Sequence, residues 1–180
     1  MTSVRNLSFM DLMTFNSINF DHLTETYGTT FYGNYFTTWP EYQRAAFHGP
    51  TGVMMGYMIG KAEGEGEDWH GHVSAVTVAP SFRRTGLGRK IMDDMETVTA
   101  SVHDAYFVDL FVRESNVIAQ EMYKALGYVV YRTVLGYYRD PKRSENALDM
   151  RKAMPRNATR SKSSVIPLDK PIRPDQLEWH

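Results

Sequence analysis

The chain has 180 residues with 42% hydrophobic and 13% aromatic content, enough for one globular domain with a hydrophobic core. Its formal net charge of −1 excludes a general attraction to nucleic acid or to an anionic membrane. It has no cysteine, which excludes disulfides, thiol nucleophiles and thiolate metal sites. No apolar run reaches the roughly 18 residues of a membrane span and no signal-peptide pattern is visible, so we expect a cytoplasmic protein outside the membrane.

The first 40 residues predict two helices. The apolar spacing within residues 9–18 indicates one helix, with Ser8 as a possible N-cap. The aromatic spacing within residues 31–39 indicates a second helix, which stops at Pro40. Residues 23–28 between them form a polar loop.

Three strands are predicted next. Residues 42–47 and 53–61 are typical of strands, and the turn at 48–52 joins them into a hairpin. Residues 64–68 form an acidic, glycine-rich turn, and residues 72–78 form the third strand.

The second half of the chain predicts two amphipathic helices. The first has an apolar stripe made of Ile91, Met95, Val98 and Val102. The second starts at Asn116 and ends at Gly127 in a left-handed conformation. Its predicted apolar face consists of Ile118, Met122 and Leu126.

The pattern is completed by two strands, predicted at residues 106–112 and 128–138, and by an edge strand at 147–154. The order of elements predicts an α/β fold with a single mixed β-sheet flanked by helices, over residues 1–154. Residues 155–180 are rich in proline, serine and charge, and we expect an extended tail, disordered in isolation.

The most informative run is the junction after the strand at residues 73–78. Arg83 and Arg84 precede Gly86 and Gly88, and a helix follows. Free N–H groups at a helix start favour an anion, arginines add donors suited to phosphate, and glycines allow close approach. This arrangement predicts a pyrophosphate cradle, the alternative being an ordinary loop with surface arginines.

Two other phosphate-binding motifs do not fit. A nucleoside-triphosphate loop needs Gly-Lys-Ser/Thr, whereas the chain has Gly88-Arg89-Lys90-Ile91. A dinucleotide fingerprint needs a third glycine where Ile91 stands.

The remaining pattern, R-x-x-G-x-G over residues 83–88, resembles the coenzyme A signature of the GNAT acetyltransferases. Several longer segments resemble the catalytic subunits of NatB-type N-terminal acetyltransferases within that superfamily. These segments lie at residues 23–28, 39–42, 55–63, 69–72, 107–113, 122–128, 130–133, 149–153 and 166–174.

The resemblance implies transfer of acetyl from acetyl-CoA to the α-amine of proteins beginning Met-Asp, Met-Glu, Met-Asn or Met-Gln, by direct transfer in a ternary complex. It also implies a large auxiliary subunit and work on nascent polypeptide N-termini at the ribosome. Two alternatives stay open: a GNAT that acts on lysine or a small amine, and a non-catalytic acyl-CoA-binding protein.

The resemblance also implies which residues bind the cofactor. The third strand would bind the pantetheine arm through its main chain, and the N–H of Val78 would stabilise the oxyanion of the thioester. Asn116 would touch the cofactor arm, with a simple N-cap as the alternative. The implied cofactor-binding residues are Val76, Thr77, Val78, Arg83, Arg84, Thr85, Gly86, Leu87, Gly88, Arg89, Asn116 and Tyr123.

Tyr123 is implied to contact the thioester sulfur. A phenol is normally a weaker acid than a thiol, so full proton transfer to the thiolate is uphill by roughly 2 kcal/mol. A hydrogen bond to sulfur, or transfer from a Tyr123 whose pKa is lowered, would be easier. A half-buried core tyrosine is the alternative.

A free α-amine has a pKa near ~8, so about a tenth of it is neutral at pH 7 and no strong base is needed. We expect His72 to accept the proton through water and Glu25 to attract the ammonium. His70 and His72 are spaced like a metal pair on a strand, but no third ligand is evident in the sequence, so no metal is expected.

Four residues resemble the loops that clasp the substrate N-terminus: Tyr27, Gly28, Tyr137 and Tyr138. Together with Glu25 and His72, they form the predicted substrate site. The aromatic residues of the two N-terminal helices predict an exposed surface for the auxiliary subunit. Its predicted members are Phe15, Phe20, Phe31, Tyr32, Tyr35 and Phe36.

Overall fold

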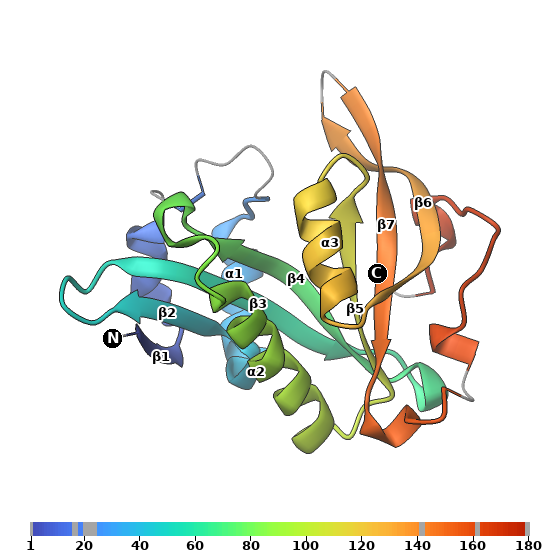
Figure 1. Cartoon of the computed structure of the whole chain (residues 1–180), viewed down its shortest axis with the longest axis horizontal. Coiled ribbons are helices and arrows are strands. Elements are labelled where there is room, and N and C mark those ends of the chain that lie inside the picture. The colour runs from blue at the N-terminus through green and yellow to red at the C-terminus, as the bar shows by residue number, and fades with distance from the viewer. Residues whose placement is uncertain (1, 16–17, 20–24, 141–142, 161–162, 179–180) are drawn as a thin grey trace. The chain divides into compact units, whose positions relative to one another are not determined.

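The computed structural model describes residues 2–15, 18–19, 25–140, 143–160 and 163–178 (Figure 1). Within these residues, seven strands form one sheet in the order β1-β2-β3-β4-β5-β7-β6. The strands are β1 (Thr2–Asn6), β2 (Arg44–His48), β3 (Met54–Glu63), β4 (His70–Val78), β5 (Phe107–Arg113), β6 (Val129–Asp140) and β7 (Arg143–Ala153).

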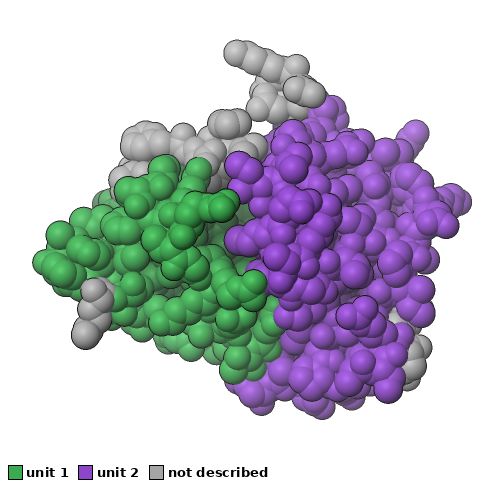
Figure 2. All heavy atoms as spheres, viewed as in Figure 1, with its two compact units in different colours: residues 1–61, 73–98 green, residues 62–72, 99–180 purple. Residues whose placement is uncertain are grey.

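The chain divides into two compact units, which Figure 2 shows in different colours. Unit 1 consists of residues 1–61 and 73–98, and unit 2 consists of residues 62–72 and 99–180. The boundary lies within β4, between His72 and Val73.

Unit 1 is built around the predicted hairpin. Strands β2 and β3 pair antiparallel, with Ala45 opposite Tyr57. Residues 54–60 of β3 are buried without alternation, which is the pattern of a strand covered on both faces. In Figure 1, helix α1 (Thr29–Thr38) lies behind these strands and helix α2 (Leu87–Ser101) lies in front of them. The predicted second helix and the hairpin are confirmed.

The first predicted helix is wrong. Residues 2–6 form β1, which pairs antiparallel with β2, and a short 3₁₀ helix at Phe9–Met13 follows. Ser8 stands at its N-cap position, where its backbone N–H and its hydroxyl both donate to the Asp11 carboxylate, at 2.8 and 2.7 Å. Such local side-chain bonds compete with a regular α-helix, so the apolar spacing alone was not decisive.

The aromatic residues predicted to be exposed are mostly core. Phe15, Tyr32 and Tyr35 are buried in one cluster with Tyr57 of β3, and Phe31 and Phe36 pack against it. Phe20 lies outside the described residues. The exposed apolar side chains of this region are instead those of the 3₁₀ helix, Phe9, Met10 and Met13.

In unit 2, the predicted edge strand lies inside the sheet. Strand β7 pairs antiparallel with both β5 and β6. It places Asp149 and Arg151 in the interior, where the Arg151 Nε donates to Asp149 at 3.0 Å and the Arg132 Nε donates to it at 3.1 Å. Charged side chains can be buried in this interior strand because they pair with one another.

Two predicted helix faces need correction. In α3 (Val117–Ala125), Ile118 is 80% exposed, whereas Gln120, Tyr123 and the following Leu126 are buried, so the buried face is rotated by about 100° from the predicted one. In α2, the apolar stripe is confirmed except for Val102, which lies beyond the last helical residue and is exposed. Gly127 follows α3 with φ 95°, the predicted left-handed conformation.

The C-terminal segment is extended in part and docks on β6. The Leu168 N–H donates to the Tyr131 carbonyl at 2.6 Å, and the Ile172 N–H donates to the Thr133 carbonyl at 3.0 Å. The buried Arg132 forms a two-pronged ion pair with Glu178. These contacts hold the described tail residues in place; the division into a domain at 1–154 and a tail at 155–180 stays a prediction.

We expect Glu178→Gln to lower the free energy of unfolding by about 1 kcal/mol, because a charge-assisted bond to a buried guanidinium is lost. Chemical denaturation of the full chain measures this. Glu121→Gln is the matched control, since the Glu121–Lys124 pair is exposed and such pairs contribute about 0–0.5 kcal/mol. Equal effects of the two substitutions would contradict a role for Arg132–Glu178 in holding the tail.

Candidate functional site

The predicted cradle lies in unit 1, where β4 ends and α2 begins. The Arg83 Nε donates to the Val78 carbonyl at 3.1 Å, and the Thr85 hydroxyl donates to the Phe82 carbonyl at 2.7 Å. Arg84 and Gly86 both have left-handed backbones, with φ 65° and 82°. Alternation of this kind turns successive N–H groups to one side and forms an anion-binding nest.

Helix α2 adds donors to the same loop. Its first backbone bond runs from the Lys90 N–H to the Gly86 carbonyl at 3.1 Å. The N–H groups of Leu87 and Gly88 stand before that bond, in the first turn, where a helix offers no acceptor of its own. Arg83, Arg84 and Thr85 are exposed. The loop therefore has the donors, the charge and the openness that an anion needs.

The strand before the cradle is held close to β3. A side chain at Gly56 would place its Cβ 2.6 Å from the Thr77 carbonyl oxygen, so this position needs glycine. The Ala79 N–H donates to the Met55 carbonyl at 2.8 Å and fixes the end of β4. Thr77 is buried, and Val76 and Val78 are partly exposed. Their predicted roles toward a cofactor are not tested by these contacts.

The predicted substrate loop of unit 1 is anchored on β4. The Tyr27 hydroxyl donates to the Ser74 carbonyl at 3.2 Å, and its ring stacks on Phe31 with centroids 4.1 Å apart. Gly28 is the N-cap residue of α1, and Glu25 lies partly exposed in the preceding coil. Tyr27 thus has a structural role whether or not it also contacts a substrate.

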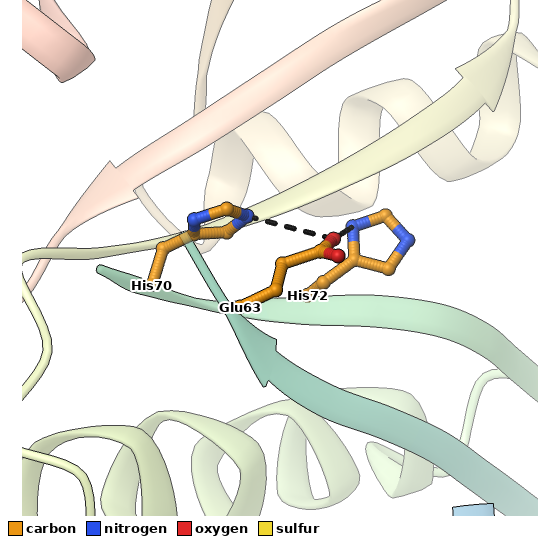
Figure 3. Close-up of side chains that lie close together, drawn as sticks. All are labelled: Glu63, His70 and His72. Atoms are coloured by element: carbon orange, nitrogen blue, oxygen red, sulfur yellow. Dashed lines mark ion pairs between the residues drawn. The ribbon is translucent and has the colours of Figure 1, made fainter. Parts of the chain in front are cut away.

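Unit 2 contains a cluster of two histidines and two carboxylates. Nδ1 of His72 lies 2.8 Å from Oδ1 of Asp109, and Nε2 of His70 lies 3.4 Å from the same oxygen. Oε1 of Glu63 lies 3.8 Å from His70 and 3.9 Å from His72, and Figure 3 shows its carboxylate between the two rings. The sequence showed no sign of a third ligand beside the two histidines. In the fold, Glu63 and Asp109 both lie close to them.

Asp109 is the buried centre of this cluster. Burial disfavours its ionised form, but His70, His72 and Arg151 outweigh burial and hold its pKa well below the usual range. Glu63, His70 and His72 offer potential metal ligands within 4.8 Å of one another. However, neighbouring ligands of a tetrahedral zinc ion are about 3.3 Å apart. The 2.8 Å contact between His72 and Asp109 is a hydrogen bond, so the cluster has the geometry of a hydrogen-bonded network.

His72 also borders an aromatic cluster. Its ring lies 5.7 Å from that of Phe111, which stacks on Tyr137 with centroids 4.7 Å apart. The Tyr138 hydroxyl donates to the Phe111 carbonyl at 3.1 Å, and Arg113 lies over the Tyr138 ring. The structure thereby brings together His72, Tyr137 and Tyr138, and adds Phe111, which the sequence analysis missed.

A bulge sets the direction of these tyrosines. The register between β6 and β7 shifts between Val134 and Tyr138, and Gly136 within this stretch has φ 61°. The Gly136 N–H donates to the Asn146 side chain at 3.0 Å. Bulges commonly re-aim side chains beside functional sites. The glycine between Leu135 and Tyr137 was the available sequence signal.

Helix α3 carries the remaining predicted residues. Asn116 caps the helix, because its Oδ1 accepts from the Ala119 N–H at 3.2 Å. Tyr123 is buried beside Tyr128, and burial raises its pKa to about 12. A lowered pKa for Tyr123 is therefore wrong, because burial disfavours the charged phenolate and the residue is held as a neutral phenol.

Comparison with known proteins identifies the fold family. The model of the acetyltransferase (GNAT) family matches residues 11–128. The chain is 57% identical to an N-terminal acetyltransferase complex ARD1 subunit homolog of Leishmania donovani, covering 99% of this chain and 100% of that one. It is 51% identical to the N-terminal acetyltransferase B complex catalytic subunit NAA20 of Arabidopsis thaliana, covering 99% of both chains.

Solved structures of N-terminal acetyltransferases also resemble this chain. Naa20 of Chaetomium thermophilum in complex with a bisubstrate analogue superposes with a TM-score of 0.87 at 38% identity, over 96% of this chain and 97% of that one. The NatB acetyltransferase complex bound to a bisubstrate inhibitor gives a TM-score of 0.84 at 34% identity, over 97% and 98%.

We expect Asn116→Ala to lower the free energy of unfolding by about 1 kcal/mol, because the first turn of α3 loses its cap. Asn116→Asp keeps the acceptor oxygen and should remain within about 0.5 kcal/mol of the original chain. Thermal and chemical denaturation distinguish the two. If both substitutions were equally mild, the cap would not contribute to stability and another role for Asn116 would be favoured.

Proposed function

Because the chain belongs to the GNAT acetyltransferase family, and within it to the NatB-type catalytic subunits, we propose that it acetylates protein N-termini. Acetyl-CoA is the donor, and the acceptors are α-amines of chains that begin Met-Asp, Met-Glu, Met-Asn or Met-Gln. Its fold is the GNAT fold, a single mixed sheet flanked by helices. The observation that carries the proposal is the 51% identity to a NatB catalytic subunit over nearly the full length of both chains.

Acetyl-CoA binding is supported by the cradle. The diphosphate of acetyl-CoA suits the exposed guanidinium groups of Arg83 and Arg84 and the positive end of helix α2. Val76, Thr77 and Val78 would bind the pantetheine arm along β4. The N–H of Val78 would then donate to the thioester oxygen, where charge develops as the carbonyl is attacked.

The transfer is direct, within a ternary complex. The chain has no cysteine, so no thiol is available to carry the acetyl group. The neutral amine attacks the thioester carbon, the C–S bond breaks, and the leaving thiolate takes a hydrogen bond or a proton from Tyr123. Because Tyr123 is held as a neutral phenol, it is suited to donate at this step.

Aromatic and polar side chains would recognise the substrate N-terminus. Tyr137 and Tyr138 offer flat apolar walls to the methionine side chain, and Tyr27 and Gly28 contribute from the loop before α1. Glu25 attracts the ammonium group. The proton of that ammonium passes to His72, directly or through water.

A large auxiliary subunit is the proposed partner, since a NatB complex is among the solved structures that resemble this chain. The exposed apolar residues Phe9, Met10 and Met13 favour a contact surface on the 3₁₀ helix.

Among the described residues, no helix is long and apolar enough to cross a membrane. We place the activity in the cytoplasm, on nascent polypeptides at the ribosome, with no direct reading of nucleic acid.

Peptide acetylation by the full chain with its auxiliary subunit tests the function. Three peptides are compared: one beginning Met-Asp, the same peptide without the methionine, and an N-terminally blocked peptide with an internal lysine. We expect kcat/KM for Met-Asp to exceed that for lysine by at least about two hundredfold, from the fraction of neutral amine at pH 7 alone. Mass spectrometry locates the acetyl group. Preference for lysine would overturn the proposal, and equal rates without the methionine would remove its side chain from recognition.

We expect Tyr123→Phe to lower kcat by about 10–100-fold with little change in the KM for acetyl-CoA, because a proton donor to sulfur is lost. Since burial raises the Tyr123 pKa to about 12, kcat of the original enzyme should show no decline from Tyr123 ionisation between pH 8 and 10. Tyr128→Phe, which removes a neighbouring buried hydroxyl, is the control and should keep its activity. Full activity of Tyr123→Phe would exclude the donor role.

A further inference from the structure

The two ring nitrogens of His72 have different surroundings. Nδ1 lies 2.8 Å from Asp109 and 3.9 Å from Glu63, in both cases facing a carboxylate oxygen. Figure 3 shows the other nitrogen pointing away from Glu63. A neutral imidazole carries one hydrogen, and a carboxylate can only accept. With the hydrogen on Nδ1, the His72–Asp109 contact is a hydrogen bond; with it on Nε2, two lone-pair-bearing atoms would face each other.

Asp109 is fixed from several sides. It lies on β5 opposite Arg151 of β7, and its side chain is completely buried. His70, on β4, approaches the same Oδ1 that bonds to His72. The charged and titratable groups around it are Glu63 of β3, His70 and His72 of β4, and Asp149 and Arg151 of β7. Together, His70, His72 and Arg151 hold the pKa of Asp109 well below its usual range, so the carboxylate is ionised and can only accept a hydrogen bond.

His70 restricts the carboxylate because its own ring is held. Its Nδ1 lies 2.6 Å from the Asp68 carbonyl, and its ring stacks on Phe107 with centroids 4.6 Å apart and planes 5° from parallel. Gly64 makes this possible: a Cβ there would lie 2.1 Å from the Asp68 oxygen. The turn, His70 and Phe107 thus hold one side of Asp109 in place, while His72 occupies its hydrogen-bonding direction.

We propose that Asp109 is a positioning residue that fixes His72 as the Nδ1–H tautomer and so leaves Nε2 as the proton acceptor in the reaction. The inference rests on the proposed N-terminal acetylation. The substrate ammonium gives one proton to Nε2, and the amine lone pair forms the N–C bond to the acetyl carbon. The C–S bond breaks, and its electron pair stays on sulfur as thiolate. The acylated nitrogen loses its second proton to solvent, and the His72 proton also returns to solvent. A carboxylate orients the catalytic histidine of serine proteases in the same way, and its amide variant there loses about 10⁴-fold in kcat.

Asp109→Asn tests the proposal in the full chain with its auxiliary subunit. We expect kcat for a Met-Asp peptide to fall about 10–100-fold, with the KM for acetyl-CoA unchanged, because the asparagine amide can turn its NH₂ toward Nδ1 and select the wrong tautomer. Glu63→Gln is the matched control: it removes a carboxylate near the same nitrogen but outside hydrogen-bonding distance, and kcat should stay within about threefold.

A double-substitution cycle separates positioning from general stability. If Asp109 acts through His72, then Asp109→Asn should cost no further activity in a His72→Ala background, because interacting residues are not additive. Multiplicative losses would overturn the proposal, as would full kcat in Asp109→Asn alone. Urea denaturation of each variant identifies loss of fold as a separate effect.

A measurement on the original chain, with one variant used only to assign a signal, covers the case in which Asp109→Asn does not fold. Nitrogen-15 NMR of the histidine-labelled full chain distinguishes protonated from unprotonated ring nitrogens, and His72→Gln assigns the signal. We expect a proton on Nδ1 and none on Nε2; the opposite tautomer would refute the inference. If the enzyme acetylates no N-terminal peptide, the proposed function fails, while the tautomer result still decides the His72–Asp109 geometry.

Discussion

Burying a carboxylate without a partner costs several kcal/mol, and unit 2 buries both Asp109 and Asp149 completely. The fold meets this cost by surrounding them with Arg132, Arg151 and the two histidines. The pairing of β7 with β5 brings Arg151 opposite Asp109, and its pairing with β6 brings Arg132 to Asp149. The interior position of β7 thus provides cationic partners for both buried carboxylates.

Features fixed by neighbours along the chain were predictable. The strand-to-helix junction at residues 76–89, the cap at Asn116 and the left-handed Gly127 all follow from local residue types. Features fixed by distant partners were not. The mutual pairing of Asp149 and Arg151, which allows both to be buried in β7, is visible only in the fold.

The same distinction applies to the site. His72, Tyr137 and Tyr138 could be named from the sequence, but Phe111, which links them, could not, because it lies in a strand where any apolar residue would be expected. Asp109 lies two residues before Phe111 within the same apolar strand, and a lone carboxylate there gives no sign of which side chain it will bind. Burial of Tyr123 raises its pKa, whereas a lowered pKa was one of the two routes to proton donation considered from the sequence.

The C-terminal segment has one more consequence. Strand β6 is the last strand of the sheet, and an uncovered strand at that place presents free N–H and C=O groups to any other chain. Ile172 forms a parallel bridge to Val134, and Leu168 takes up a further carbonyl, so part of this outer side is already occupied. Displacing residues 168–172 from β6 would expose its N–H and C=O groups to pairing with a strand of another molecule. The protein would then be prone to self-association and aggregation through β6.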